Sequence, residues 1–314
     1  MVITLRFFIT AILLLLLATQ LDLSLVVSLL QTIKLHWVFA ALSLMVLLRV
    51  IAAIRWHCVL KHHAHSVSLL EVIEITFISS SLGHFLPSGV GGDVVRGMQL
   101  SHRYGLLTET ASSILVDRAV GIFSMLLMGL MGLIGSAIAR SNVDTIDFFW
   151  PLLLVNITFI SLWFASARVH SILQASAVAP PQKAQRVYQS ALQILETVAN
   201  RKRLYRLLPR IFSLSILAQL LRCLMFYFLY RAFGIDLPFI YFVAYVPLVF
   251  VVMQLPLSIG GLGLREGALV YFFGALGIAS EVSVNVGIIS HGLQILAVLP
   301  GLLLWMLRRS YKSG

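Results

Sequence analysis

The sequence predicts an all-α polytopic membrane protein, with about six spanning helices and two broken re-entrant helical hairpins arranged as an inverted-topology repeat. Two observations carry this prediction. The chain is 60% hydrophobic and only 11% charged, with a mean hydropathy of +0.97, whereas a soluble domain carries roughly twice that charge. In addition, residues 87–96 (PSGVGGDVVR) and 256–265 (PLSIGGLGLR) place proline, paired glycines and arginine at identical spacing. We expect a single membrane domain over residues 1–314.

Six apolar runs are long enough to cross a bilayer as helices. They are Leu5–Leu21, Trp37–Ile54, Ala111–Ala139, Phe148–Ala167, Ile211–Phe233 and Val284–Leu307. The first run also resembles a cleaved signal peptide, because Arg6 precedes a leucine run. No small-x-small cleavage site follows it clearly, so we expect this helix to be retained.

Two further segments, Leu69–Tyr104 and Phe239–Ile278, have a different pattern. Each contains two short helical stretches separated by proline and glycine, and each is too long for one span. A broken helix leaves backbone groups that lipid cannot satisfy, so such breaks persist only inside protein or around a wet cavity. Two of them in corresponding halves indicate a binding site at membrane depth.

The basic residues predict how the spans are oriented. The positive-inside rule places the Arg55–His65 loop, the Arg168–Arg210 loop and the basic tail after Leu307 in the cytoplasm, and Arg140–Asp147 outside. The first hairpin then has both ends inside, and the second has both ends outside. We therefore expect an integral, multi-pass protein of the cell (inner) membrane with cytoplasmic N- and C-termini.

The repeat unit predicted from this topology is a helix, a broken hairpin and a helix. It covers residues 37–139 and, inverted, residues 211–307, with a connecting span and a linker at 140–210. Three pairs of intramembrane cationic residues follow the same spacing within a few residues: Arg49 with Arg222, Arg96 with Arg265, and Arg118 with His291. These pairs support two related halves.

The linker contains a second candidate lipid contact. After Pro180 and Pro181, apolar residues between Val187 and Val198 fall on one helical face beside Lys183, Arg186 and Arg201. This pattern is typical of an amphipathic helix on the cytoplasmic leaflet. A connector whose basic face is only solvated fits the pattern equally well.

The formal net charge of +11 does not indicate a nucleic-acid partner, because the cations are scattered between hydrophobic spans without a binding module. They favour contact with anionic headgroups instead. The two cysteines, Cys58 and Cys223, form no CxxC motif, and the histidines of the Arg55–His65 loop lack a completed ligand set. We expect no metal and no cofactor.

The duplicated motif has the parts of an anion site. Glycine lets backbone N–H groups approach a ligand closely, proline ends the preceding helix, and a helix that starts after the glycines aims its positive end at the site. An arginine about one turn later can hold two phosphate oxygens in a fork. The residues concerned are Pro87, Gly91, Gly92, Arg96, Pro256, Gly260, Gly261 and Arg265.

A purely structural interpretation stands beside this one. The glycines then serve tight helix packing, and the arginines neutralise carboxylates, for which Asp93, Asp117 and Glu266 are the candidates. Arg118 fits either interpretation. Arg222 sits near the centre of its span, where an unpaired charge is costly, so it should face a partner or a cavity.

An intramembrane enzyme acting on polyprenyl phosphates is the main alternative function. Glu71 and Glu74 lie on the arm that leads into the first motif, and His84 or Ser88 would supply a base or nucleophile. The second motif has no matching histidine, so we do not expect an enzyme. A non-transporting membrane scaffold is the third class.

Three segments carry a resemblance to a known family: FLPSGVGGDVVRG, SSILVDRAVGI at Ser112–Ile122, and LPLSIGGLGLREG. With the order of spans, they resemble the transmembrane domain of lysylphosphatidylglycerol synthases, a flippase-like family that also exists as stand-alone membrane proteins. The resemblance implies a domain that moves a phospholipid between leaflets, with the motif arginines near the headgroup path. Because the sequence ends at Gly314 without a synthase domain, we do not expect lysine transfer.

The sequence thus favours a membrane lipid translocator for an anionic or phosphate-containing headgroup, on a phospholipid or a polyprenyl-phosphate lipid. The expected site comprises the eight motif residues above with Asp93, Asp117, Arg118, Arg222, Glu266 and His291. Without a nucleotide-binding motif, movement is downhill, coupled to ions through Asp93, Asp117 or Glu266, or driven by a partner. Partners left open are a second copy, forming a homo-oligomer, and an enzyme of lipid synthesis.

Overall fold

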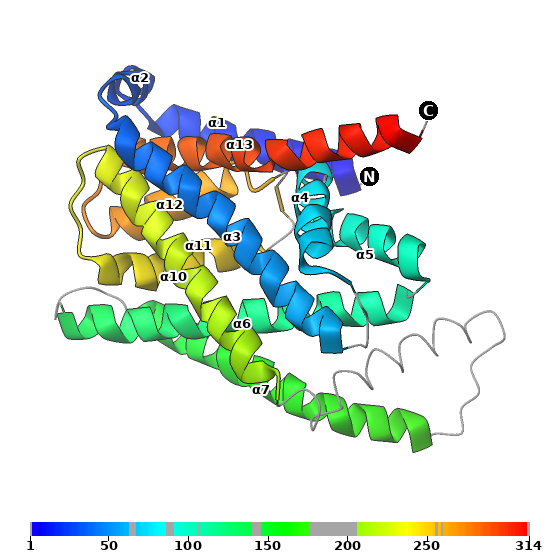
Figure 1. Cartoon of the computed structure of the whole chain (residues 1–314). Coiled ribbons are helices and arrows are strands. Elements are labelled where there is room, and N and C mark those ends of the chain that lie inside the picture. The colour runs from blue at the N-terminus through cyan, green and yellow to red at the C-terminus, as the bar shows by residue number, and fades with distance from the viewer. Residues whose placement is uncertain are drawn as a thin grey trace.

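The computed structural model describes residues 2–62, 67–85, 91–105, 107–139, 146–175, 206–254, 257–258 and 260–312, and all regular structure among them is helical (Figure 1). The helices are α1 (Val2–Gln20), α2 (Leu23–Gln31), α3 (Leu35–His62), α4 (Leu69–Phe85), α5 (Gly91–Tyr104), α6 (Leu107–Ala139), α7 (Ile146–Ala175), α10 (Leu208–Ala232), α11 (Phe239–Met253), α12 (Leu264–Gly274) and α13 (Ser280–Lys312). The amphipathic helix predicted after Pro181 lies outside the described residues.

Four helices are long and apolar enough to cross a membrane, at Leu35–Lys61, Thr108–Ile138, Leu208–Ala232 and Ser280–Leu307. These four agree with predicted spans. The run predicted at Leu5–Leu21 is most of α1, which bends by 86° into α2, so the two form at most one broken span. The apolar part of α7, Phe148–Trp163, is a shorter helix. The chain is therefore an integral multi-pass membrane protein with four or five candidate spans.

The sequence prediction was wrong about where the third helix ends. Arg55 was expected to open a cytoplasmic loop, but α3 continues through it to His62. The helix persists because Arg55 is held inside the protein by Asp117 of α6 and Ser215 of α10. A charged residue at the end of an apolar run thus belongs to the helix when the fold supplies its partner.

Two sets of four helices, α3–α6 and α10–α13, repeat the order long, short, short, long. Their lengths are 28, 17, 14 and 33 residues in the first set and 25, 15, 11 and 33 in the second. The short pairs are the predicted hairpins. Each duplicated motif runs into the second short helix of its own set, with Arg96 in α5 and Arg265 in α12.

The two sets pack against each other in matching pairs. The long helices α3 and α10 lie along one another through the middle of the molecule (Figure 1). Helix α6 packs on α11, and its counterpart α13 packs on α4; likewise α6 contacts α10, and α13 contacts α3. Exchanging the two sets maps each of these contacts onto another one, as a two-fold arrangement requires. The opposite membrane orientation of the halves stays a prediction.

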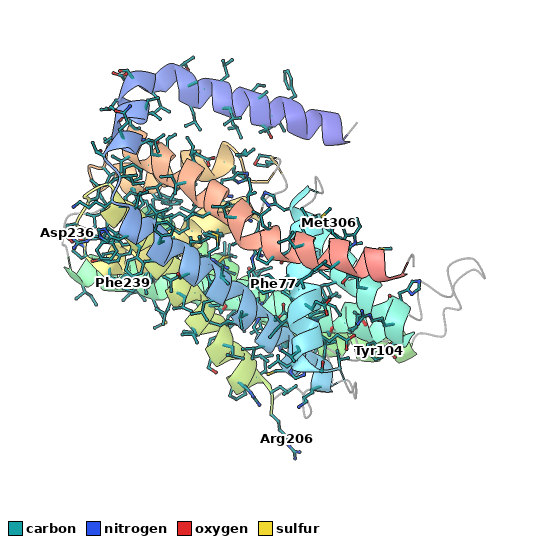
Figure 2. All side chains as sticks on the ribbon, turned by 45° about the horizontal axis from the view of Figure 1, so that its top comes forward. Phe77, Tyr104, Arg206, Asp236, Phe239 and Met306 are labelled. Atoms are coloured by element: carbon teal, nitrogen blue, oxygen red, sulfur yellow. The ribbon has the colours of Figure 1, made fainter. Side chains whose placement is uncertain are left out.

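The largest apolar core among the described residues is centred on the second set, where aromatic rings of α10, α11 and α12 contact one another, and it extends to α3, α6 and α7. Tyr230 stacks on Phe273 with ring centroids 4.4 Å apart, and Phe242 meets both rings at 5.5 and 5.3 Å. All three side chains are fully buried. Figure 2 shows side chains filling the space around these helices, with α1 at the periphery. This core fixes the helices that carry the second motif.

Glycine permits the closest helix contacts between the two sets. A Cβ added at Gly132 of α6 would collide with the backbone of Ala244 in α11, and one added at Gly301 of α13 would collide with the backbone of Phe77 in α4. Beside the second contact, Ser81 donates a hydrogen bond to the Val298 carbonyl. Backbones this close give membrane helices their packing energy, since the hydrophobic effect does not drive helices together in lipid.

We expect Gly301→Ala to lower the free energy of unfolding by about 1–3 kcal/mol, because the backbone it would strike cannot move aside as a side chain can. Gly292→Ala is the matched control on the same helix, where an added Cβ has nothing within 4 Å, and it should be neutral or slightly stabilising. Thermal unfolding in detergent measures both. Equal stabilities of the two variants would contradict the close contact between α4 and α13.

Candidate functional site

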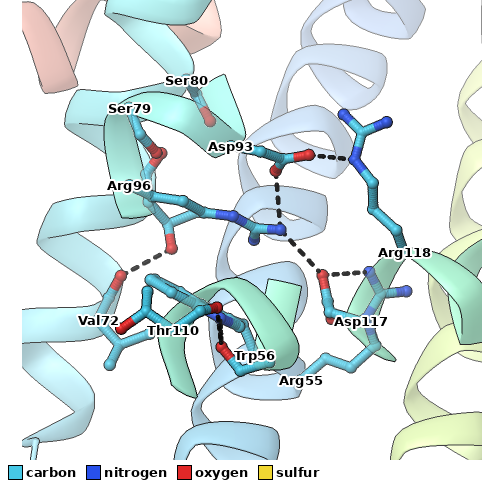
Figure 3. A network of polar contacts seen from close by, with 12 residues as sticks. Arg55, Trp56, Val72, Ser79, Ser80, Asp93, Arg96, Thr110, Asp117 and Arg118 are labelled. Atoms are coloured by element: carbon cyan, nitrogen blue, oxygen red, sulfur yellow. Dashed lines mark hydrogen bonds and ion pairs between the residues drawn. The ribbon is translucent and has the colours of Figure 1, made fainter. Parts of the chain in front are cut away.

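The first motif places Arg96 in an ion network inside the protein. Arg96, in the second turn of α5, is 8% exposed. Its Nη2 lies 2.8 Å from Asp93 Oδ1 and 3.5 Å from Asp117 Oδ2, and its guanidinium lies 4.7 Å from the centre of the Trp56 ring. Figure 3 shows Arg96 lying between the two carboxylates. Two anions therefore compensate its charge.

Two more arginines complete this network. Arg55 of α3 forms a bidentate ion pair with Asp117. Its Nε donates to Oδ1 at 2.7 Å, and its Nη2 donates to Oδ2 at 3.1 Å. It also donates to the Ser215 hydroxyl of α10 at 3.0 Å. Arg118 of α6 pairs with Asp93 (Figure 3). The network, Arg55, Asp93, Arg96, Asp117 and Arg118, ties α3, α5 and α6 together and keeps one net positive charge.

The second motif holds its arginine very differently. Arg265 is 3% exposed, and its guanidinium contacts only neutral groups. Its Nη1 donates to Ser290 Oγ at 3.0 Å, while Nη2 lies 3.3 Å from Gln294 Oε1 and 3.4 Å from His291 Nδ1. Its Nε has no hydrogen-bond partner among the described residues. A buried cation is thus held by neutral hydrogen-bond partners, with no carboxylate at salt-bridge distance among the described residues, although the charge of the adjacent Glu266 acts on it from farther away.

The repeat explains this difference at the level of sequence. The motif spacing aligns Asp93 with Leu262, and the spacing that aligns Arg118 with His291 aligns Asp117 with Ser290. Both carboxylates of the first network are therefore replaced by neutral residues in the second half. Ser290 still bonds to its arginine, as Asp117 does, but it contributes no charge.

Glu266, next to Arg265, does not take over the missing role. Its Oε2 accepts a hydrogen bond from the Gly263 amide at 2.7 Å and so caps the N-terminus of α12. Its Oε1 is buried without a partner among the described residues. The carboxylate is committed to the helix end and forms no salt bridge with Arg265.

Arg49 and Arg222, the matched pair on the two long central helices, also have neutral partners. Arg49 donates to Ser80 Oγ at 3.3 Å. Arg222 donates to Gln219 Oε1 at 2.6 Å and lies 4.5 Å from the centre of the Phe250 ring. Both are half-buried. Within the described part of the chain, no carboxylate reaches salt-bridge distance of either one or of Arg265.

These arginines share one neighbourhood with two histidines. The charges of Arg49 and Arg265 both act on His84 at the end of α4, and the His84 ring lies 5.3 Å from that of His291. The charges of Arg55 and Arg49 both act on Arg222. We name Arg49, Arg222 and Arg265 the cationic centre. Its members come from α3, α10 and α12, and Arg49 and Arg222 lie on the two long helices that pack along one another between the helix sets.

The comparison with known families follows from this geometry. A family model described as "Lysylphosphatidylglycerol synthase TM region" matches residues 3–301, which include both motifs. The chain belongs to this family. The match confirms the resemblance seen in the sequence, and it gives this lysylphosphatidylglycerol synthase TM-region protein a membrane function related to lipids. Among curated proteins, none matches the chain.

In this member of the lysylphosphatidylglycerol synthase TM-region family, the two glycine pairs have different structures. Gly91 and Gly92 are the first residues of α5, where Gly92 lies against Gly83 of α4 so closely that a Cβ on Gly83 would collide with it. Gly260 and Gly261 stand in a loop with φ of +61° and +79°, a conformation that favours glycine. The first pair packs helices, and the second shapes the backbone beside Arg265.

Other predicted positions also differ between the halves. Arg265 is in the first turn of α12, not a full turn into the helix as expected. Pro87 and Pro256 lie outside the described residues. His291 lines the second site beside Gly260, where an added Cβ would come within 3.5 Å of its ring. Of the predicted site residues, Asp93, Arg96, Asp117 and Arg118 thus lie in the ion network, and Arg222 and Arg265 lie in the cationic centre.

Sequence reasoning missed Arg55, Ser290 and Gln294. Nothing in the sequence links Arg55 to Asp117, which lies 62 positions away. Ser290 was open to prediction, because the spacing between Arg118 and His291 aligns it with Asp117. Gln294 follows Ser290 by one helical turn and therefore faces the same side of α13.

Proposed function

We propose that this protein moves lipids with an anionic, phosphate-containing headgroup between leaflets, and that the cationic centre holds the headgroup. The observation that supports this proposal is the lack of carboxylate partners for Arg49, Arg222 and Arg265 among the described residues. Burying an uncompensated charge costs several kcal/mol, and charged side chains inside membrane proteins usually serve substrates or ions. A bound phosphate would supply the missing negative charge.

The form of the three arginines suits a phosphate. Guanidinium presents its donors in a planar fork that matches a pair of phosphate oxygens. The Nη groups of Arg265 bond to neutral acceptors, and its Nε has no partner among the described residues, so a phosphate would give this cation an anionic acceptor. Arg96 is different, since Asp93 and Asp117 already occupy it. We assign it a structural role in the network.

The route across the membrane follows from the paired packing of the helix sets. We propose that the two sets form an inverted repeat and expose the cationic centre alternately to each leaflet, with the acyl chains remaining in lipid. The close contacts of α6 on α11 and of α13 on α4 are the surfaces along which the sets would move. In this scheme the chain is a transporter and not an enzyme.

Leaflet exchange in proteoliposomes tests the proposal. We expect the native chain to accelerate exchange of labelled phosphatidylglycerol or a polyprenyl phosphate about tenfold more than that of phosphatidylcholine. Phosphatidylcholine has the same phosphate but adds a quaternary ammonium that the cationic centre would repel, and a difference of about 1.4 kcal/mol in headgroup binding is tenfold. Comparing the first two lipids distinguishes a phospholipid from a polyprenyl substrate.

Three results would contradict the proposal. Equal exchange of all lipids would mean a leak without a headgroup site. If the protein accelerated exchange of none of these lipids, the proposal that the isolated chain transports them would be wrong. Release of inorganic phosphate from the polyprenyl phosphate would instead identify an enzyme.

A further inference from the structure

A large apolar cavity lies away from the cationic centre, between α6, α7 and α10. Its volume is about 500 Å³. Aromatic rings from all three helices line it: Phe123 stacks on Phe159 with centroids 5.6 Å apart and tilts against Phe212 at 6.0 Å. Trp163 and Ala119 also line it. The volume falls in the range of ligand cavities, which hold mostly apolar surface.

This cavity is separate from the ion network, although helix α6 borders both. Asp117 faces α3 and α5, where it binds Arg55 and Arg96. Two residues later, Ala119 faces α7 and α10 across the cavity. None of the five network residues lines the cavity. The cavity therefore offers an apolar ligand a place that the ion network does not occupy.

Exposed arginines lie close in the chain to residues that line the cavity. Leu208 and Pro209, at the start of α10, line the cavity. Arg206 and Arg210 flank these two residues in the chain, and both are exposed. Arg168 lies on α7 little more than one turn beyond Trp163 and is also exposed. An apolar hollow with basic residues at its end matches the two parts of an anionic lipid, an alkyl chain and a phosphate.

We propose that the cavity binds one acyl chain of an anionic phospholipid, whose phosphate lies at Arg206 and Arg210. The bound molecule is a resident lipid and not the transported one, so the inference does not depend on the proposed function. Ordinary boundary lipid would exchange freely and ignore headgroup charge. A lipid held in a cavity with a basic end is retained longer than boundary lipid, and its retention depends on the negative charge of its headgroup.

Native mass spectrometry of the full chain, released from mild detergent with added phosphatidylglycerol or phosphatidylcholine, tests the site. We expect one phosphatidylglycerol per chain to be retained, and Ala119→Phe, which fills the cavity, to lower that retention about tenfold. Ala137→Phe is the matched control, since Ala137 is exposed on the same helix. It should retain the lipid like the native chain. Arg206→Gln with Arg210→Gln should remove the preference for phosphatidylglycerol over phosphatidylcholine.

A second measurement avoids any loss of folding in the variants. Phosphatidylglycerol with a photoreactive acyl-chain end should label the native chain saturably in peptides that contain Phe123, Phe159 or Phe212. Unlabelled phosphatidylglycerol should compete for the labelling. Retention by folded Ala119→Phe equal to that of the control, or labelling that is not competed, would overturn the site. A dimer mass that Ala119→Phe removes would also overturn it, because a second copy would then occupy the cavity.

Discussion

Arg265→Gln should reduce exchange of phosphatidylglycerol between leaflets about 10- to 100-fold while the protein remains folded. The arginine contributes its charge to the cationic centre, and losing a charged hydrogen bond to phosphate costs about 1.5–3 kcal/mol. Stability should stay equal or rise, because Ser290, Gln294 and His291 can bond to an amide and the cost of burying the charge disappears. Exchange assays at matched reconstitution and thermal unfolding in detergent measure the two effects.

Two other substitutions make this result specific. Arg231→Gln is the matched control, since Arg231 pairs with exposed Asp236 outside the centre, and its exchange rate should equal that of the native chain. Ser290→Asp should slow exchange like Arg265→Gln, because it places a carboxylate beside Arg265 as Asp117 stands beside Arg96. Native exchange rates in both Arg265→Gln and Ser290→Asp would show that the headgroup does not use Arg265.

Asp117→Asn, unlike Arg265→Gln, should destabilise the fold. The expected loss is about 3–5 kcal/mol, the usual cost of removing one partner from a buried ion pair. The amide keeps the shape of the side chain but leaves Arg55 and Arg96 without the charge that both bind. Asp236→Asn is the matched control. The Asp236 side chain is 75% exposed, so that substitution should stay within about 0.5 kcal/mol. Thermal unfolding in detergent compares the two.

Equal melting temperatures for Asp117→Asn and Asp236→Asn would mean that the network contributes nothing to the fold. If Asp117→Asn had the native melting temperature but slowed lipid exchange, Asp117 would act in transport and not in stabilising the fold.

Much of the architecture could be predicted because its signals are local. Long apolar runs gave four spans, and proline with glycine gave the positions of both hairpins. The first apolar run was harder. Its length and composition fit a span, but the turn at Asp22, which caps α2 through the amides of Ser24 and Leu25, bends the chain and depends on geometry that hydropathy does not register.

Most residues of the candidate site could be predicted from the sequence. Their separation into an ion network and a cationic centre could not. The motif singled out Arg96 and Arg265 as equivalents, since proline, glycine and arginine match in both copies. Their surroundings are decided by residues far along the chain, such as Asp117 for Arg96 and Ser290 for Arg265. The motif alone therefore predicts two equivalent arginines, whereas the charges around Arg96 and Arg265 differ.

The unequal halves imply a preferred resting conformation. In an alternating mechanism built from identical halves, the two end states of the empty carrier would have equal free energy. Here the first half carries the ion network, whereas the second half holds Arg222 and Arg265 without a carboxylate at salt-bridge distance among the described residues, so the two end states would differ in free energy. At equilibrium the lipid distribution is unchanged by this bias. Under the proposed transport mechanism, the two directions would nevertheless have different half-saturating lipid concentrations, and the protein would work as a kinetic rectifier.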